Sequence, residues 1–146
     1  MSHSHNNAAR TFIATANGEL CAFCSVLPFP HYKVKGAWKA HRTVVFPDYQ
    51  GIGIGHVVSS LVGEIMLKEG KRFLSVTSHP AFIHSRQKDP RWRMGRVGRI
   101  TGGGISTSVI HNQPGNSQVQ SNGRLTASFE YMGEKSVKSK NSVKTV

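Results

Sequence analysis

Residues 44–70 read VVFPDYQGIGIGHVVSSLVGEIMLKEG and form the most informative junction in the 146-residue chain. A β-branched run ends at Pro47, a short polar turn follows, and three glycines at alternate positions lead into a helical pattern. Glycines let the backbone approach a ligand closely, because no Cβ intervenes. The free N–H groups at the start of the following helix direct positive partial charge at an anion. The stretch therefore predicts a phosphate-binding turn between a strand and a helix.

Three phosphate-binding patterns can be compared with residues 50–55, QGIGIG. A Walker A loop needs Lys and then Ser or Thr after its last glycine, whereas His56 and Val57 follow Gly55. A dinucleotide-binding turn needs a glycine at the position of His56. It also needs a carboxylate about twenty positions further on, where residues 74–78, LSVTS, contain none. The third pattern, Q/R-x-x-G-x-G/A, is satisfied. The alternative is an ordinary tight turn between strand and helix.

Residues 45–55, VFPDYQGIGIG, resemble the acyl-CoA motif of the GCN5-related N-acetyltransferases, and the resemblance extends from residue 11 to about residue 85. It implies an α/β (α+β) fold, with a mixed, mostly antiparallel sheet, a central splayed pair of strands and helices packed on the sheet. It implies acetyl-CoA as the acyl donor, with its thioester in the gap between the splayed strands. By this resemblance the pantetheine arm would contact the strand backbone and the pyrophosphate would lie on the turn, at Thr43, Val44, Val45, Gln50, Gly51, Ile52, Gly53, Ile54 and Gly55.

Three side chains are candidate catalytic groups for the reaction that this resemblance implies, the direct attack of a primary amine on the thioester. His41 is the candidate base, because the pKa of imidazole suits proton transfer near neutral pH. A surface or satisfied strand histidine is the alternative. The family often has a Tyr on the short helix after the second core strand, which protonates the leaving thiolate. Residues 79–90 contain no Tyr, and His84 and Ser85 are the nearest substitutes.

The remaining pattern predicts the element order β-β-β-α-β-α-β-β. Asn17 and Gly18 predict a two-residue hairpin turn, since both central residues of a type I′ turn need positive φ. The long helix should present one apolar face, and a Ser78-His79-Pro80 pattern should cap and start the short helix. That apolar face comprises Ile54, Val57, Val58, Leu61, Ile65 and Met66. The expected strands are residues 11–16, 19–27, 38–46, 73–77, 105–111 and 124–131, and residues 92–100 could form a further strand.

The length supports one domain at residues 11–132, between a flexible N-terminus at residues 1–10 and a basic, disordered tail at residues 133–146. The usual N-terminal strand and helices of the family have no counterpart before residue 11. The chain would then be a fragment, a reduced form of the family, or a domain completed by a second copy or another partner. No apolar run is long enough to span a membrane, so the sequence predicts a soluble, cytoplasmic protein that does not bind membranes.

The net charge of +12 and the pI of about 10.3 leave a second class of function open. Residues 86–99 contain a cluster of basic side chains that could neutralise the 3′-phosphate of CoA or contact nucleic acid. The alternative function is therefore a non-catalytic basic module of the same fold. The basic cluster comprises Arg86, Lys88, Arg91, Arg93, Arg96 and Arg99.

Cys21 and Cys24 lie three residues apart on an apolar strand, which predicts two buried thiols on opposite faces rather than a metal or redox site.

Overall fold

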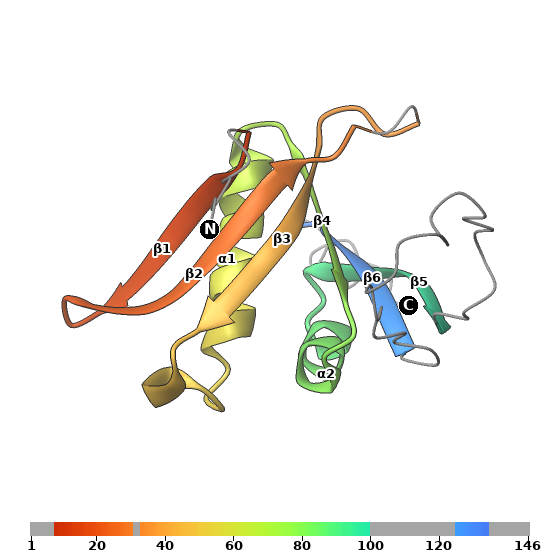
Figure 1. The fold of residues 1–146 in the computed structure, drawn as a ribbon. Helices are drawn as coiled ribbons and strands as arrows, with labels where there is room; N and C mark the ends of the chain where they lie inside the picture. The colour runs from red at the N-terminus through yellow and green to blue at the C-terminus, as the bar shows by residue number, and fades with distance from the viewer. Residues whose placement is uncertain (1–7, 31–32, 100–124, 135–146) are drawn as a thin grey trace, which may run out of the picture.

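The computed structural model describes residues 8–30, 33–99 and 125–134, which form a six-stranded mixed sheet and two α-helices (Figure 1). The strand order is β1-β2-β3-β4-β6-β5, and every neighbouring pair is antiparallel except β3 with β4. The predicted fold class is confirmed. The strands are β1 Arg10–Ala16, β2 Glu19–Pro28, β3 Ala37–Val45, β4 Arg72–Thr77, β5 Trp92–Arg99 and β6 Leu125–Tyr131, and the helices are α1 Ile54–Lys68 and α2 Pro80–Lys88.

The first three strands form an antiparallel meander. The predicted hairpin turn is present, since Asn17 has φ 52° and Gly18 has φ 84°. The pairing of β1 with β2 passes from Ala14 and Ala22 to Thr15 and Leu20, so a β-bulge falls at Cys21. Cys21 and Cys24 are free and buried, as predicted. Both belong to the same core cluster, however, because the bulge interrupts the alternation of faces on which the opposite-face prediction rested.

The parallel pairing of β3 with β4 is short. It joins residues 37–39 to residues 72–74 and stops there. Beyond this point β3 stays paired with β2 and β4 with β6, and the two strands diverge (Figure 1). The structure therefore contains the splayed pair of strands that the sequence predicts, and it opens toward the ends where the glycine turn and α2 begin.

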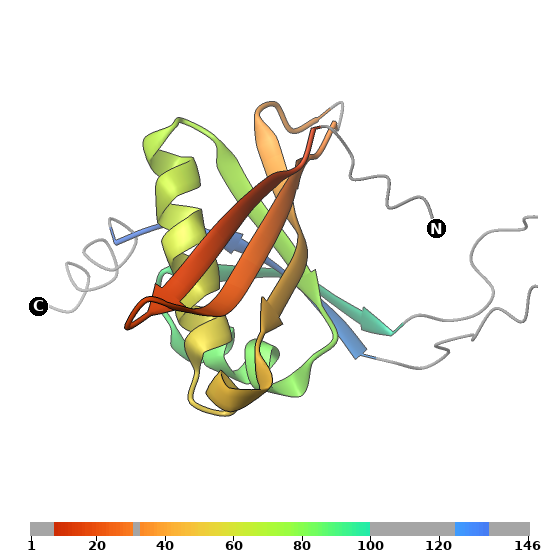
Figure 2. The ribbon, with the colours of Figure 1, turned by 60° about the vertical axis from the view of Figure 1, so that its left-hand side comes forward.

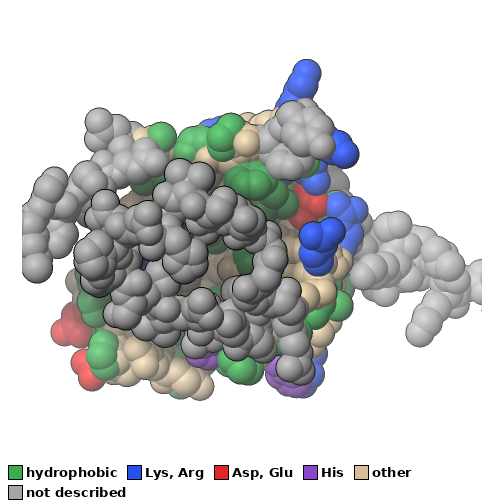
Figure 3. Space-filling model, turned by 45° about the vertical axis from the view of Figure 1, so that its right-hand side comes forward, with side chains coloured by type: hydrophobic (Ala, Val, Ile, Leu, Met, Phe, Trp, Pro, Cys, Tyr) green, Lys and Arg blue, Asp and Glu red, His purple; other side chains and the backbone are tan. Residues whose placement is uncertain are grey.

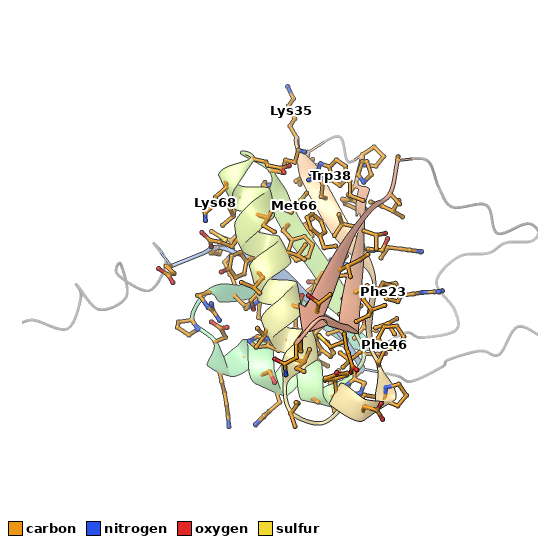
Figure 4. The ribbon with its side chains drawn as sticks, turned by 90° about the vertical axis from the view of Figure 1, so that its left-hand side faces the viewer. Phe23, Lys35, Trp38, Phe46, Met66 and Lys68 are labelled. Carbon is orange, nitrogen blue, oxygen red and sulfur yellow. The ribbon has the colours of Figure 1, made fainter. Side chains whose placement is uncertain are left out.

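Helix α1 packs against the sheet along a face that differs from the predicted one. Val58 and Met66 are buried as expected, and Met66 points toward the sheet, whereas Phe23 and Phe46 lie on the opposite sheet face (Figure 4). Val57, Leu61 and Ile65 are instead 54%, 59% and 40% exposed. The buried face of α1 consists mostly of small side chains, which allow close approach to the sheet: Gly55, Val58, Ser59, Ser60, Val62, Gly63 and Met66.

Helix α2 lies beside α1 and packs on β5, as a second view of the ribbon shows (Figure 2). His79 is its N-cap residue, but neither Ser78 nor His79 caps it through a side chain, because the Thr77 hydroxyl accepts the His79 N–H instead. The predicted strand at 105–111 lies outside the described residues, as do residues 1–7 and most of the predicted tail. No helix in the described part of the chain has the length and apolar character needed to cross a membrane.

Candidate acyl-CoA site

The glycine turn joins the open end of β3 to the start of α1. A short 3-10 helix, η1 Pro47–Tyr49, follows β3 and leads into the turn. Gly51 and Gly53 have φ values of 82° and 84°, so both occupy the left-handed region that favours glycine. The Gln50 side chain closes the turn by donating from Nε2 to the Val45 carbonyl, at 2.8 Å. The local sequence thus fixes a sharp change of direction at the helix start.

Five consecutive N–H groups at this turn are available for a ligand. Among the described residues, none accepts a hydrogen bond from the N–H groups of residues 51–55. The helical hydrogen bonds begin with His56 and Val57, which both donate to the Gly53 carbonyl. Such a set of unpaired donors at a helix N-terminus is suited to an anion such as a pyrophosphate.

A groove of about 540 Å³ runs from this turn toward the gap between β3 and β4 and is called the glycine-turn groove. Among the predicted cofactor contacts, Val44 and Ile52 do not line it, and the Ile52 side chain is 72% exposed. The groove is lined by Thr43, Val45, Tyr49, Gln50, Gly51, Gly53, Ile54, Gly55, His56, His79, Ala81, Phe82 and Ser85.

The three candidate catalytic side chains are not brought together. His41 is exposed on β3 and does not line the groove. His84 is exposed on α2 and lines a separate depression with Ser78 and Ile83. Ser85 alone lines the glycine-turn groove, where it is partly buried.

Two polar residues in the groove escaped sequence reasoning. Tyr49 lines its outer end, and its hydroxyl donates to Glu19 at 3.1 Å. That hydrogen bond raises the pKa of Tyr49. His56 lies in the first turn of α1, with Nε2 2.9 Å from Asp89 Oδ2 at the end of α2. The sequence gives one sign of His56, because it occupies the position at which a dinucleotide-binding turn has its third glycine.

The basic cluster at 86–99 is not a continuous surface. Arg86 is buried, Arg91 pairs with Asp89, and Arg93 pairs with Glu130. On the face shown in Figure 3, Lys and Arg side chains lie next to an acidic side chain. Within the part of the cluster whose side chains the structure describes, Lys88 and Arg96 are exposed and have no carboxylate partner.

Comparison with solved structures identifies the same fold. IAA acetyltransferase from Bacillus cereus is 16% identical with a TM-score of 0.57, over 85% of this chain and 77% of that one. The ribosomal-protein-S18-alanine N-acetyltransferase from Escherichia coli is also 16% identical, with a TM-score of 0.57 over 87% of this chain and 70% of that one. A Bacillus subtilis acetyltransferase in complex with CoA is 15% identical, with a TM-score of 0.58 over 86% and 78%. No curated protein matches the sequence.

The family comparison covers the segment that contains the glycine turn, the splayed strands and most of α2. The sequence model of the acetyltransferase (GNAT) family matches residues 2–86, which is more than half of the chain. The chain therefore belongs to the GNAT acetyltransferase family.

Proposed function

We propose that this protein transfers an acyl group, acetyl by default, from acetyl-CoA to a primary amine. The observation that carries the proposal is the glycine-turn groove, which lies between the end of β3, the glycine turn and α2. The N–H groups of residues 51–55 at this turn have no acceptor among the described residues. Family membership and the CoA complex of the similar Bacillus subtilis acetyltransferase support acetyl-CoA as the donor. Residues 11–132 would form the catalytic domain.

The groove residues suit the parts of acetyl-CoA. The N–H groups of residues 51–55 would hold the pyrophosphate, and Gly51 and Gly53 keep that surface free of side chains. Beyond Lys39, the edge of β3 that faces β4 has no partner strand in the described part of the chain, so Thr43 and Val45 would contact the pantetheine arm there. Val44 would contribute through its backbone only, since its side chain lies outside the groove.

A second groove, called the outer groove, offers a route for the amine. Its volume is about 300 Å³, and Leu74 and Val76 of β4 line it. These residues alternate with the buried Phe73 and Ser75, so their side chains lie on the sheet face opposite the core. An amine bound there would approach the thioester from the side away from α1. His41, His84 and Ser85 stay predictions as catalytic groups, as do a cytoplasmic location and a partner copy that completes the acceptor site.

The test compares two glycines with the same backbone conformation. Gly53 and Gly18 both have φ 84°, and a Cβ at either would meet no atom within 4 Å. Gly53→Leu and Gly18→Leu therefore carry similar backbone strain, but only the first places a side chain at the pyrophosphate surface. By isothermal titration calorimetry, Gly53→Leu should weaken acetyl-CoA binding at least about tenfold, which is about 1.4 kcal/mol, while Gly18→Leu stays near wild type.

Equal binding by both variants would show that the turn does not hold the pyrophosphate. A wild-type protein that binds no acetyl-CoA, yet shifts RNA or DNA in a salt-sensitive gel assay, would favour the non-catalytic alternative. The burial of Arg86 and the pairing of Arg91 and Arg93 with carboxylates count against that alternative for residues 86–99.

A further inference from the structure

Arg86 is a buried cation without a carboxylate partner among the described residues. Its residue surface is 2% exposed. The guanidinium donates from Nη1 to the Ser75 hydroxyl of β4 and from Nη2 to the Ser59 hydroxyl of α1, both at 2.8 Å. Its Nε has no hydrogen-bond partner. Arg86 therefore joins α2 to α1 and β4 through neutral hydroxyls and leaves one buried donor unsatisfied.

Aromatic rings around Arg86 favour its positive charge, and burial opposes it. The guanidinium carbon lies 4.4 Å from the Trp92 ring centroid, 5.0 Å from that of Phe82 and 5.6 Å from that of Phe129. Burial lowers the pKa of Arg86 to about 10, which still leaves it charged at neutral pH. A buried charge without a counter-ion costs stability, and a well-packed apolar side chain is often at least as stabilising. The rings and the two hydroxyls hold the guanidinium in place, but no carboxylate among the described residues neutralises its charge.

Arg86 contacts β4 next to the point where the pairing of β3 with β4 stops. Its partner Ser75 follows Leu74, the last β4 residue paired with β3. On the β3 side, the Thr43 hydroxyl donates to the Cys24 sulfur. The helix that carries Arg86 also contributes Phe82 and Ser85 to the glycine-turn groove. The guanidinium thus lies behind the groove wall, at the point to which the gap converges.

We propose that Arg86 is a positioning residue whose charge, acting across the groove wall to which Phe82 belongs, stabilises the sulfur of CoA as it leaves. This inference rests on the proposed function. In the reaction the amine nitrogen bonds to the acyl carbon, the carbon–sulfur bond breaks, and sulfur departs with the bonding electron pair. The proton that the amine loses passes to a base or to solvent and finally to sulfur. Arg86 gives up no proton, but it favours the negative charge on sulfur.

The chemistry of the groove is consistent with this role. Helix α2 contains no Tyr, and the hydroxyl of Tyr49 is engaged with Glu19. A cation that stabilises the thiolate removes the need for a proton donor at the moment when the carbon–sulfur bond breaks. A guanidinium is suited to this, because it stays charged throughout the working pH range.

The first test needs no knowledge of the acceptor. The full chain is saturated with CoA, and ultraviolet absorbance of the thiolate is followed up to about pH 9, below the pKa of about 10 to which burial lowers Arg86. The titration of the CoA-free protein is subtracted to remove Cys21 and Cys24. Wild type and Arg86→Lys should lower the pKa of the bound CoA thiol relative to free CoA, and Arg86→Gln should abolish that shift. Arg96→Gln, a change at an exposed arginine, should leave it intact. His56 and His79 line the groove in every variant, so their contribution cancels.

The second test is transfer from acetyl-CoA to a panel of alkylamines. Arg86→Gln should lower kcat by about 10-fold to 100-fold with KM for acetyl-CoA nearly unchanged, less than the loss of a directly contacting donor. Arg86→Lys should recover most of kcat. If Arg86→Gln does not fold, Ser75→Ala removes the connecting hydroxyl and should still reduce the shift in the thiol pKa.

The outcomes separate the two proposals. A wild type that binds no CoA contradicts the proposed function itself. A wild type that binds CoA with an unshifted thiol pKa overturns the role of Arg86 alone, as does a full shift retained in Arg86→Gln or in Ser75→Ala. Failure of Arg86→Lys to do better than Arg86→Gln would also overturn it, since a charge role predicts rescue by Lys.

Discussion

At the scale of single residues, the glycines of the site have two different physical roles. Gly51 and Gly53 are required by positive φ, and the spacing QGIGIG predicted the turn because this conformation is encoded locally. Gly55 has ordinary helical geometry and is required by contacts instead. A Cβ built on Gly55 would lie 2.7 Å from Phe82 Cζ and 3.2 Å from Val45 Cγ2. The role of Gly55 therefore depends on residues distant in sequence, and no local pattern shows it.

Gly55→Ala should destabilise the fold by about 1–3 kcal/mol, because the added methyl overpacks the junction of α1, β3 and α2. Gly98→Ala on β5 is the matched control, since its Cβ would meet no atom within 4 Å. Urea denaturation of both variants measures the difference. If Gly55→Ala is as stable as the control, α2 can move away from α1 without cost, and the groove is less rigid than its contacts indicate.

At the scale of elements, helix α1 shows why hydrophobic periodicity was only partly successful. The apolar pattern predicted the long helix, which the structure places at Ile54–Lys68. It selected the wrong face, because Gly55, Ser59 and Gly63 recur every fourth residue and are buried although none is strongly apolar. The same limit applies to Arg86, which composition assigned to a surface cluster and the structure buries. Close packing selects small or hydrogen-bonded side chains, and a scale of hydrophobicity does not detect them.

The end of α2 is tied to the start of α1 through Asp89, which accepts hydrogen bonds from Arg91 and faces His56. Burial opposes ionisation of this carboxyl, but the hydrogen bonds from Arg91 and then His56 outweigh it and lower the pKa of Asp89 from 3.8 to about 2. A lowered carboxyl pKa stabilises the folded state above the unfolded-state pKa and loses that effect as pH falls through the folded-state pKa. Asp89 should therefore contribute to acid unfolding between about pH 4 and pH 2.

Asp89→Asn should lower stability at neutral pH and flatten the loss of stability over that acid range. Urea denaturation at a series of pH values measures both effects. Glu69→Gln is the comparison, because Glu69 pairs with Arg10 and Lys71 at the surface, where ion pairs contribute little. An acid slope in Asp89→Asn equal to that of wild type would show that the His56–Asp89–Arg91 cluster does not hold the helices together.

At the scale of the whole molecule, the candidate binding site lies at the boundary between two parts of one sheet. β1, β2 and β3 form one part, and β4, β6 and β5 form the other. The resemblance at the glycine turn predicted the splayed pair correctly, because the turn and the parallel connection through α1 are adjacent in sequence. The outer groove could not be predicted, since β4 and β6 come together only through pairing of residues 73–77 with residues 127–131.

Acetyl-CoA should stabilise the whole protein, because a ligand that fills the gap binds only when both parts of the sheet are in place. At a free concentration one hundred times its Kd, the expected gain is about 2.7 kcal/mol. Urea denaturation with and without acetyl-CoA measures it, with Gly53→Leu as the variant expected to lose the gain at the same concentration. A similar gain in Gly53→Leu would place the ligand elsewhere on the molecule.

The short junction of β3 with β4 also bears on how the chain folds. The meander of β1, β2 and β3 is built from neighbours in sequence, and its first turn is encoded by Asn17 and Gly18. Residues 37–39 pair with residues 72–74 across a connection that contains the whole of α1. Closing such a long loop for three residue pairs gains little until α1 and β6 pack as well. We therefore expect the meander to form early in folding and the junction with β4 to form late.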